Sequence, residues 1–139
     1  MKIFLYYIGK PRDANANALA VEYIKRVQRY ARCEMREIQP ARFDMCAKHP
    51  AAIRILLDPG GKRLDSHQFA RFMSKAEQEA RDLVFTIGGA SGYPEGWREK
   101  ADMLLSLSTL TLPHEFARVI VAEQIYRAFT ILKGHPYSK

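Results

Sequence analysis

Cysteine and long hydrophobic runs are both scarce in this sequence of 139 residues. No stretch approaches the roughly 18 uninterrupted apolar residues of a membrane-spanning helix, so we expect no membrane span. The first residues, MKIFLYYIGKPRD, hold a short apolar run without a small-residue cleavage site, which favours a first β-strand over a signal peptide. The two cysteines, Cys33 and Cys46, lack C-x-x-C spacing and fit free thiols in a reducing cytoplasm.

Several motifs that mark common enzyme classes are also missing. The sequence contains no H-E-x-x-H, no Cys/His zinc spacing and no G-x-S-x-G, so it predicts no metal site. The glycine loop Gly88-Gly89-Ala90-Ser91-Gly92 has neither the G-x-G-x-x-G order nor the Gly-Lys-Ser/Thr ending of phosphate-binding loops, which disfavours NAD and nucleoside triphosphates. Neither cysteine lies in a nucleophile motif, which disfavours covalent chemistry at pyrimidine C5.

Acidic residues are outnumbered, with 15 aspartates and glutamates against 22 lysines and arginines and a net charge of +7. Such an excess on a small domain favours a polyanionic partner, usually nucleic acid. The basic residues concentrate early in the chain, where a solvated helix face is the alternative explanation for some of them. We expect one group of these residues to contact the phosphates of such a partner: Lys25, Arg26, Arg29 and Arg32.

Apolar segments alternate with segments of helical periodicity along the whole chain. Strands are expected over residues 2–9, 34–40, 52–61, 82–89 and 103–112, and helices over 15–31, 64–81, 93–102 and 113–134. The third strand is expected to end in a turn at Asp58-Pro59-Gly60-Gly61, and residues 41–50 fit a loop or a short helix. This order predicts one α/β domain over residues 1–139, with a mostly parallel sheet covered by helices on both faces.

Ligands of such sheets gather beyond the carboxyl ends of the strands. Three strand ends here are unusual: Leu57 before its Asp-Pro-Gly-Gly, the glycine loop 88–92, and the Leu-Ser-Thr-Leu-Thr-Leu run of residues 107–112. Glycine lets the backbone come close to a ligand because it has no Cβ. At the 107–112 junction, free backbone groups can read the edge of a purine while leucines flank its ring.

The last helix carries a charged pair on a partly apolar stripe of Phe116, Ile120, Glu123, Arg127 and Thr130. Spacing alone leaves two readings of Glu123 and Arg127 open, a structural pair or part of a site. For His114, next to Pro113, a structural role is favoured over ligand contact. The terminal GHPYSK places a histidine and a tyrosine, His135 and Tyr137, where a frayed end is the ordinary expectation.

Three stretches resemble one known family: LLDPGGKRLDSHQFA (56–70), FTIGGASG (85–92) and LSLSTLTLPHEFARVIVAEQIYRAFTILKGHPY (105–137). They are similar to the ribosomal RNA large subunit methyltransferase H family, SPOUT-class enzymes that methylate N3 of a pseudouridine in 23S rRNA. The resemblance covers nearly the whole chain. It implies a SPOUT fold with a trefoil knot near the carboxyl end, S-adenosylmethionine as cofactor, a homodimer, and 23S rRNA of the large subunit or the assembled ribosome as substrate.

The resemblance also implies site residues. Cofactor contacts are expected from Leu57, Gly88, Leu107, Ser108, Thr109, Leu110, Thr111 and Leu112. Catalytic roles are expected for Glu123, Arg127, His135 and Tyr137.

The chain departs from the family in two places. Ser138 stands where the family tail commonly ends in histidine, and Ala90-Ser91 stands where it often has Pro-Glu. The alternatives are a non-enzymatic RNA- or ribosome-binding protein on the same fold, and a SPOUT enzyme with another RNA target.

Overall fold

A five-stranded sheet organises residues 1–138, the part of the chain that the computed structural model describes. Its strands are paired in parallel in the order β2-β1-β4-β3-β5. β4 is central and all five of its residues are buried, which explains its continuously apolar sequence. The strand bounds are β1 (Lys2–Ile8), β2 (Arg32–Ile38), β3 (Ile53–Arg63), β4 (Leu83–Ile87) and β5 (Met103–Ser106).

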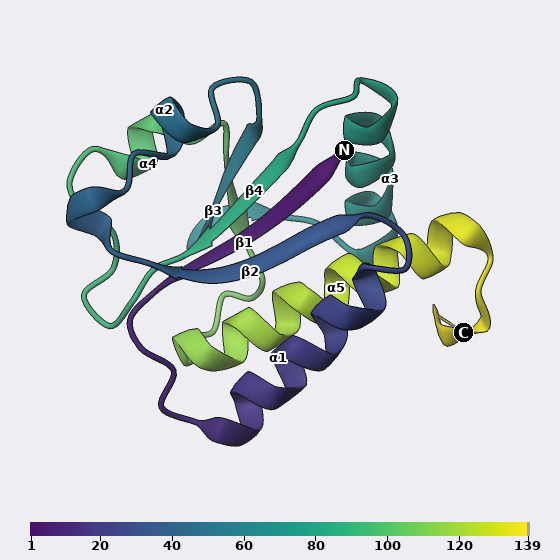
Figure 1. The fold of residues 1–139 in the computed structure, drawn as a ribbon, viewed down its shortest axis with the longest axis horizontal. Helices are drawn as coiled ribbons and strands as arrows, with labels where there is room; N and C mark the ends of the chain where they lie inside the picture. The colour runs from purple at the N-terminus through teal and green to yellow at the C-terminus, as the bar shows by residue number, and fades with distance from the viewer. Residues whose placement is uncertain (139) are drawn as a thin grey trace.

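Helices cover both faces of the sheet, so the predicted α/β fold class is confirmed (Figure 1). The long helices α1 (Ala14–Val27), α3 (Ser66–Gln78) and α5 (His114–Lys133) share one face and the larger core. Two one-turn helices, α2 (Met45–Lys48) and α4 (Trp97–Lys100), cover the other face with a smaller core around Tyr6 and Trp97. Two 3₁₀ turns, η1 (Pro40–Arg42) and η2 (Pro136–Ser138), complete the elements.

Local sequence signals fix where the long helices begin and end. The Asp65 carboxylate accepts the Gln68 N–H at 2.7 Å and the Gln68 side chain accepts the Asp65 N–H at 2.8 Å, so the two residues form a capping box at the start of α3. Asp13 caps α1 by accepting the Ala16 N–H at 3.0 Å. Gly134 ends α5 with φ of 70°, a left-handed conformation that glycine adopts freely.

Two expected boundaries are wrong. The last strand was expected to reach Leu112, but β5 ends at Ser106. The reason is that the backbone after Ser106 forms hydrogen bonds with serine side chains instead of with a neighbouring strand. The Ser106 hydroxyl donates to the Ser108 carbonyl and the Leu110 N–H donates to the Ser108 hydroxyl, each at 3.0 Å. Residues 107–112 therefore form a loop.

The second correction concerns Asp-Pro-Gly-Gly, which does not end its strand. β3 continues to Arg63, and the extra residues are absorbed by a shift of register, so that Leu105 of β5 lies opposite both Leu57 and Lys62. The second strand, expected over 34–40, is displaced to Arg32–Ile38, and the ends of the other elements differ from the expected bounds by a few residues. Residues 40–48 contain η1 and α2.

The membrane span, the cysteines and the knot were further subjects of the sequence analysis. No helix within residues 1–138 is long and apolar enough to span a bilayer. Both cysteines are free, and burial raises the pKa of Cys33 to about 12. The trefoil knot implied by the family resemblance stays a prediction.

Candidate functional site

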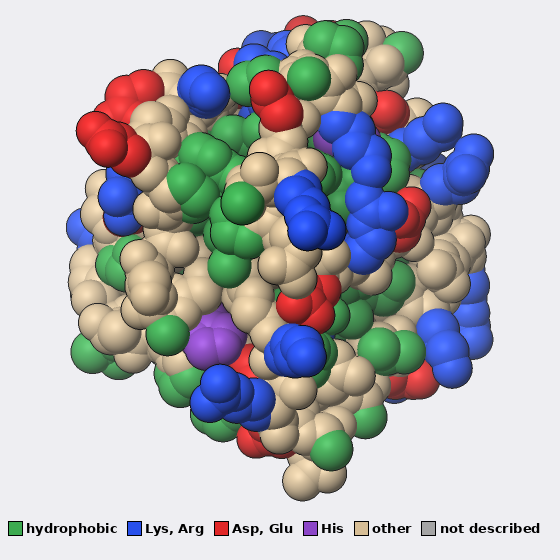
Figure 2. Space-filling model, turned by 60° about the vertical axis from the view of Figure 1, so that its left-hand side comes forward, with side chains coloured by type: hydrophobic (Ala, Val, Ile, Leu, Met, Phe, Trp, Pro, Cys, Tyr) green, Lys and Arg blue, Asp and Glu red, His purple; other side chains and the backbone are tan. Residues whose placement is uncertain are grey.

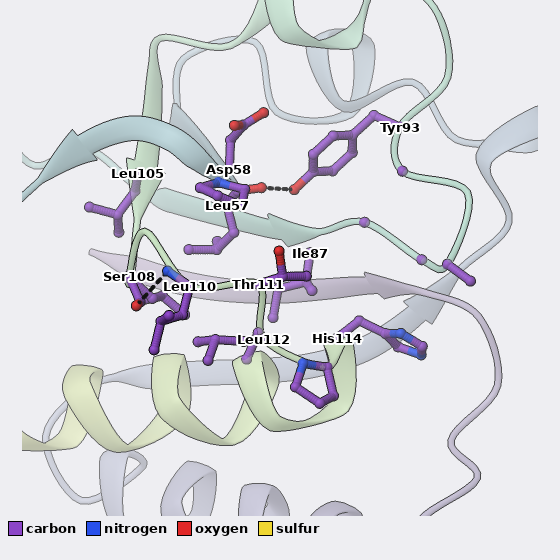
Figure 3. Close-up of a pocket in the computed structure, with 18 of the residues that line it drawn as sticks. Leu57, Asp58, Ile87, Tyr93, Leu105, Ser108, Leu110, Thr111, Leu112 and His114 are labelled. Carbon is purple, nitrogen blue, oxygen red and sulfur yellow. Dashed lines mark hydrogen bonds between the residues drawn. The ribbon is translucent and has the colours of Figure 1, made fainter.

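A pocket of about 330 Å³ opens where the irregular passage of β3 at residues 57–59 and the carboxyl ends of β4 and β5 meet the first turn of α5 (Figure 3). Parallel strands bring their carboxyl ends to one edge of the sheet, so segments far apart in the sequence meet here. The lining residues that Figure 3 labels are Leu57, Asp58, Ile87, Tyr93, Leu105, Ser108, Leu110, Thr111, Leu112 and His114.

The glycine loop after β4 is tightly packed at two positions. A Cβ on Gly88 would lie 3.2 Å from the backbone of Gly92, and one on Gly89 would lie 3.1 Å from the Ile8 carbonyl oxygen. The Gly92 N–H closes the loop on the Gly89 carbonyl at 2.9 Å. Gly88 therefore presents bare backbone to the pocket, as its sequence position led us to expect.

Tyr93 forms a rigid wall of the pocket that the sequence did not single out. Its hydroxyl lies 2.6 Å from the carbonyl oxygen of Leu57, where the pairing of β3 becomes irregular, and 2.9 Å from that of Thr86, near the end of β4. Burial raises the pKa of Tyr93, so the phenol stays protonated and donates to these oxygens. Its position shortly after the glycine loop was the one available signal.

An ion pair borders the pocket on the α4 side. Arg98 Nε lies 2.6 Å from Asp58 Oδ2, and the Gly60 N–H donates to Asp58 Oδ1 at 2.8 Å. The guanidinium, and next the Gly60 N–H, lower the pKa of Asp58. The carboxylate is thus ionised at neutral pH, and its charge is balanced by Arg98.

Most of the residues expected to bind cofactor converge on this pocket. Those that line it are Leu57, Gly88, Leu107, Ser108, Leu110, Thr111 and Leu112. Thr109 is exposed in the same loop and is not among the lining residues. His114 also lines the pocket, although a structural role was favoured for it.

The expected catalytic residues gather elsewhere, in a cluster around the Glu123 carboxylate. Arg127 Nη2 and Nε lie 2.7 Å and 3.1 Å from Glu123 Oε2, and the Tyr137 hydroxyl donates to the same oxygen at 2.8 Å. The Tyr23 hydroxyl is 3.3 Å from that of Tyr137. Burial, and next these hydrogen bonds with Tyr23 and Glu123, raise the pKa of Tyr137. We call Tyr23, Glu123, Arg127 and Tyr137 the carboxylate cluster.

The carboxyl-terminal tail is docked against this cluster. The Tyr137 ring packs edge-on against Tyr126, with centroids 4.6 Å apart, and Arg127 lies over the Tyr137 ring at 5.2 Å. The Tyr137 N–H donates to His135 Nδ1 at 3.1 Å, while the His135 side chain is exposed. The tail is therefore ordered by contacts, contrary to the ordinary expectation for a chain end.

Within one chain the carboxylate cluster lies further along α5 than the pocket. His114 and Ala117 line the pocket from the first turn of α5, and Glu123 and Arg127 follow Ala117 by six and ten residues on the same helix. At a rise of 1.5 Å per residue these separations are about 9 Å and about 15 Å. The end of α1 lies beside the carboxylate cluster. Its Arg26 lies over the rings of Tyr23 and Tyr126, at 5.1 Å and 5.7 Å from their centres.

Solved structures share this fold. A probable methyltransferase from Bordetella pertussis Tohama I superimposes with a TM-score of 0.61 over 91% of this chain and 93% of its own, at 13% identity. The SpoU methyltransferase AviRb from Streptomyces viridochromogenes, solved in complex with the cofactor AdoMet, gives a TM-score of 0.53 over 91% of this chain and 57% of its own, also at 13% identity.

Sequence comparison gives a closer assignment. The family model for “Predicted SPOUT methyltransferase” matches residues 1–138, so the fold and sequence define a methyltransferase of the SPOUT class. Proteins named ribosomal RNA large subunit methyltransferase H match along the whole chain. That of Solibacter usitatus is 58% identical over 99% of both chains, and that of a Thermus thermophilus strain is 37% identical over 100% of this chain and 99% of its own. The chain belongs to the ribosomal RNA large subunit methyltransferase H family.

Proposed function

We propose that this protein transfers a methyl group from S-adenosylmethionine to N3 of a pseudouridine in 23S rRNA of the large ribosomal subunit, in the cytoplasm. The observation that carries the proposal is the 58% identity to a protein named ribosomal RNA large subunit methyltransferase H, over 99% of both chains. The pocket at the carboxyl ends of the strands and the net charge of +7 support it.

The pocket suits the proposed cofactor. Its volume of about 330 Å³ lies within the range of small-molecule sites. Leucine side chains supply apolar walls for a purine ring, and residues 107–112 lie outside the sheet, so most of their backbone groups are not committed to strand pairing. Gly88 adds a wall without a side chain. When bound, S-adenosylmethionine supplies an electrophilic methyl group on a sulfonium.

In this proposal the carboxylate cluster removes a proton from the pseudouridine and stabilises the negative charge that develops on it. N3 of pseudouridine carries a proton at neutral pH, which has to leave as the N–CH₃ bond forms. The Tyr137 hydroxyl takes this proton on its oxygen while passing its own to Glu123 Oε2, 2.8 Å away. Arg127 stabilises the negative charge that develops on the carbonyl oxygens of the base. Ser138 replaces the usual tail histidine, so that histidine is not the proton acceptor here.

His135 has a positioning role in this scheme. Its Nδ1 accepts the Tyr137 N–H, so in the neutral ring the proton is on Nε2. That N–H donates to an oxygen of the base and helps to orient it.

A homodimer brings the two parts together, because Glu123 and Arg127 lie about 9 Å and about 15 Å beyond the pocket-lining Ala117 along α5 in one chain. α5 has an uncovered stripe on which Phe116 is 51% exposed and Val119 and Ile120 are half-buried, next to Glu123 and Arg127. Pairing of two copies along this stripe in a two-fold dimer presents each carboxylate cluster to the partner's pocket.

Mapping of N3-methylpseudouridine in rRNA from a strain lacking this protein tests the proposal. The methyl group should be missing and should return when purified protein and S-adenosylmethionine are added to the mutant ribosomes. Methylation of tRNA instead would assign another RNA target. Calorimetry without detectable S-adenosylmethionine binding would favour a non-enzymatic RNA-binding protein.

The Tyr137→Phe variant tests the catalytic assignment. It should lower kcat by about 100-fold or more, as loss of a proton-transfer group does, while S-adenosylmethionine binding stays unchanged. An unchanged kcat would contradict the role given to Tyr137.

A further inference from the structure

The loop of residues 9–13 lies directly beside the pocket and carries two exposed basic side chains. It follows β1, which pairs with β4, and the Ile8 carbonyl packs against Gly89 of the pocket. Lys10 and Arg12 are exposed, and neither forms an ion pair within residues 1–138. Figure 2 turns this side of the molecule forward and shows Lys and Arg side chains around an apolar hollow.

A carboxylate in the first turn of α5 holds the backbone of this loop. Glu115 Oε1 accepts the Arg12 N–H at 2.7 Å and the Asp13 N–H at 3.0 Å. Glu115 directly follows His114, which lines the pocket. The loop and the pocket wall are therefore fixed by adjacent residues of one helix turn.

The buried side chain of Arg118 contacts the elements on which the loop of residues 9–13 and Glu115 lie. Arg118 is 1% exposed, and its guanidinium carbon lies 4.0 Å from the centre of the Tyr7 ring. Its Nη1 donates to Asn17 Oδ1 at 2.9 Å, and its Nη2 is 3.7 Å from Glu115 Oε1. This one side chain joins the end of β1, the start of α1 and Glu115. Burial of a guanidinium is unfavourable unless the group is paired. Its contacts with three elements therefore indicate that Arg118 holds Glu115 and the adjoining loop in position.

We propose that Lys10 and Arg12 bind backbone phosphates of the substrate RNA beside the nucleotide that enters the pocket, and that Glu115 and Arg118 are positioning residues for this contact. The inference rests on the proposed function and names a second RNA-binding surface on the same protein. Among residues 1–138, Arg98 on the α4 side is the only lysine or arginine that lines the pocket. Its charge is neutralised by Asp58. The unpaired positive charges beside the pocket are therefore those of Lys10 and Arg12 in the loop of residues 9–13. Lys25 and Arg26 are in the last turn of α1, at the other end of that helix.

The test uses ribosomes from a strain lacking the modification, with Lys10→Ala/Arg12→Ala as the variant and Arg71→Ala/Lys75→Ala, on the exposed side of α3, as the matched control. At saturating S-adenosylmethionine the loop variant should raise KM for ribosomes about tenfold with kcat within twofold. The slope of log affinity against log salt should become shallower by about 1 to 2, as expected for the loss of two phosphate contacts. The control variant should match the wild type.

Co-sedimentation with the same ribosomes separates the two proposals. Weaker binding of the loop variant than of the control supports the inference even when no methylation is detected, whereas failed methylation by the wild type counts against the proposed function. Equal binding and equal salt slopes of the loop variant and the wild type would overturn the inference, and so would a wild type that does not bind ribosomes.

The positioning role has its own test. Glu115→Ala should raise KM for ribosomes several-fold although Lys10 and Arg12 are intact, and Glu115→Gln should restore most of the loss, because an amide oxygen also accepts both backbone N–H groups. S-adenosylmethionine binding by calorimetry checks that the pocket is preserved. Wild-type KM in Glu115→Ala, or no rescue by Gln, would overturn the positioning role.

Discussion

Single polar side chains shape the pocket wall. Tyr93 reaches back from the loop after β4 to the carbonyl oxygens of Leu57 in β3 and Thr86 in β4, and Asp58 is held by Arg98 and the Gly60 N–H. The family resemblance implied Leu57 and Gly88 as cofactor contacts, and both line the pocket, but sequence analysis missed Tyr93 and Arg98. Nothing in the spacing of these two indicates that a tyrosine or arginine in a connecting segment folds back over the sheet.

Removal of the Tyr93 hydroxyl should destabilise the protein. Tyr93→Phe leaves the carbonyl oxygens of Leu57 and Thr86 without this donor, which costs about 1–2 kcal/mol in the free energy of unfolding. Urea denaturation measures the change. Tyr30→Phe is the matched control, since the Tyr30 hydroxyl makes no hydrogen bond within residues 1–138. Equal effects of the two variants would contradict the assignment.

The Asp58 pair should make stability depend on pH at the acidic end. Because the pKa of Asp58 is lowered in the folded state, its stabilising effect is fully present above the usual value of 3.8 and is lost as pH falls through the lowered value. Asp58→Asn should therefore be less stable than the wild type at pH 7, by on the order of 1 kcal/mol because Arg98 is half exposed.

Unfolding curves recorded from pH 7 downward measure this dependence. The two proteins should converge as the pH passes below 3.8. The exposed Glu99→Gln serves as control and should follow the wild type throughout. A constant difference between Asp58→Asn and the wild type would mean that the ion pair is not its cause.

Elements were predictable wherever periodicity was strong, and their ends were not. The order of strands and helices, the parallel sheet and the Asp65 capping box follow from hydrophobic pattern and local capping. The end of β5 was missed because the alternation of leucine with serine and threonine continues past Ser106, while hydrogen bonds of the serine hydroxyls turn the chain. The irregular passage of β3 through Asp-Pro-Gly-Gly depends on its pairing with β5, which a single segment cannot reveal.

This passage predicts unequal roles for two neighbouring glycines. A Cβ on Gly61 would lie 2.6 Å from the backbone of Leu104 in β5, whereas one on Gly60 would meet only the Asp58 side chain, at 3.3 Å. Gly61→Ala should lower the free energy of unfolding by about 1–3 kcal/mol, as overpacking against backbone does. Gly60→Ala should cost clearly less in the same urea titration. A reversed order would show that the strands separate easily here.

The whole molecule places its two groups of functional candidates at different positions along α5, one at its first turn and one from its middle to the tail that follows it. The residues alone left the role of each group open, and the family resemblance assigned cofactor binding to one and catalysis to the other. The structure adds that in one chain Glu123 and Arg127 lie about 9 Å and about 15 Å beyond the pocket-lining Ala117 along the helix. Which surface of a second copy meets the pocket is decided by shape and exposed apolar area, which no spacing encodes.

Mixing of two inactive variants tests the dimeric site. Gly88→Val blocks the pocket, and Tyr137→Phe disables the carboxylate cluster. If each site is shared between copies, random exchange gives half mixed dimers with one intact site each, so about a quarter of wild-type activity should return in a two-fold assembly. The readout is methylation of unmodified ribosomes after subunit exchange. No recovery above the sum of the separate activities would place the whole site in one chain.

The length of α5 also has a kinetic consequence. Under the proposed pairing, the tail of a subunit does not reach the pocket of the same subunit, so the monomer is inactive. Specific activity should then fall on dilution, and below the dissociation constant of the dimer the rate should rise with the square of protein concentration. A cell would in this way keep the enzyme silent at low copy number and switch it on steeply as its synthesis increases.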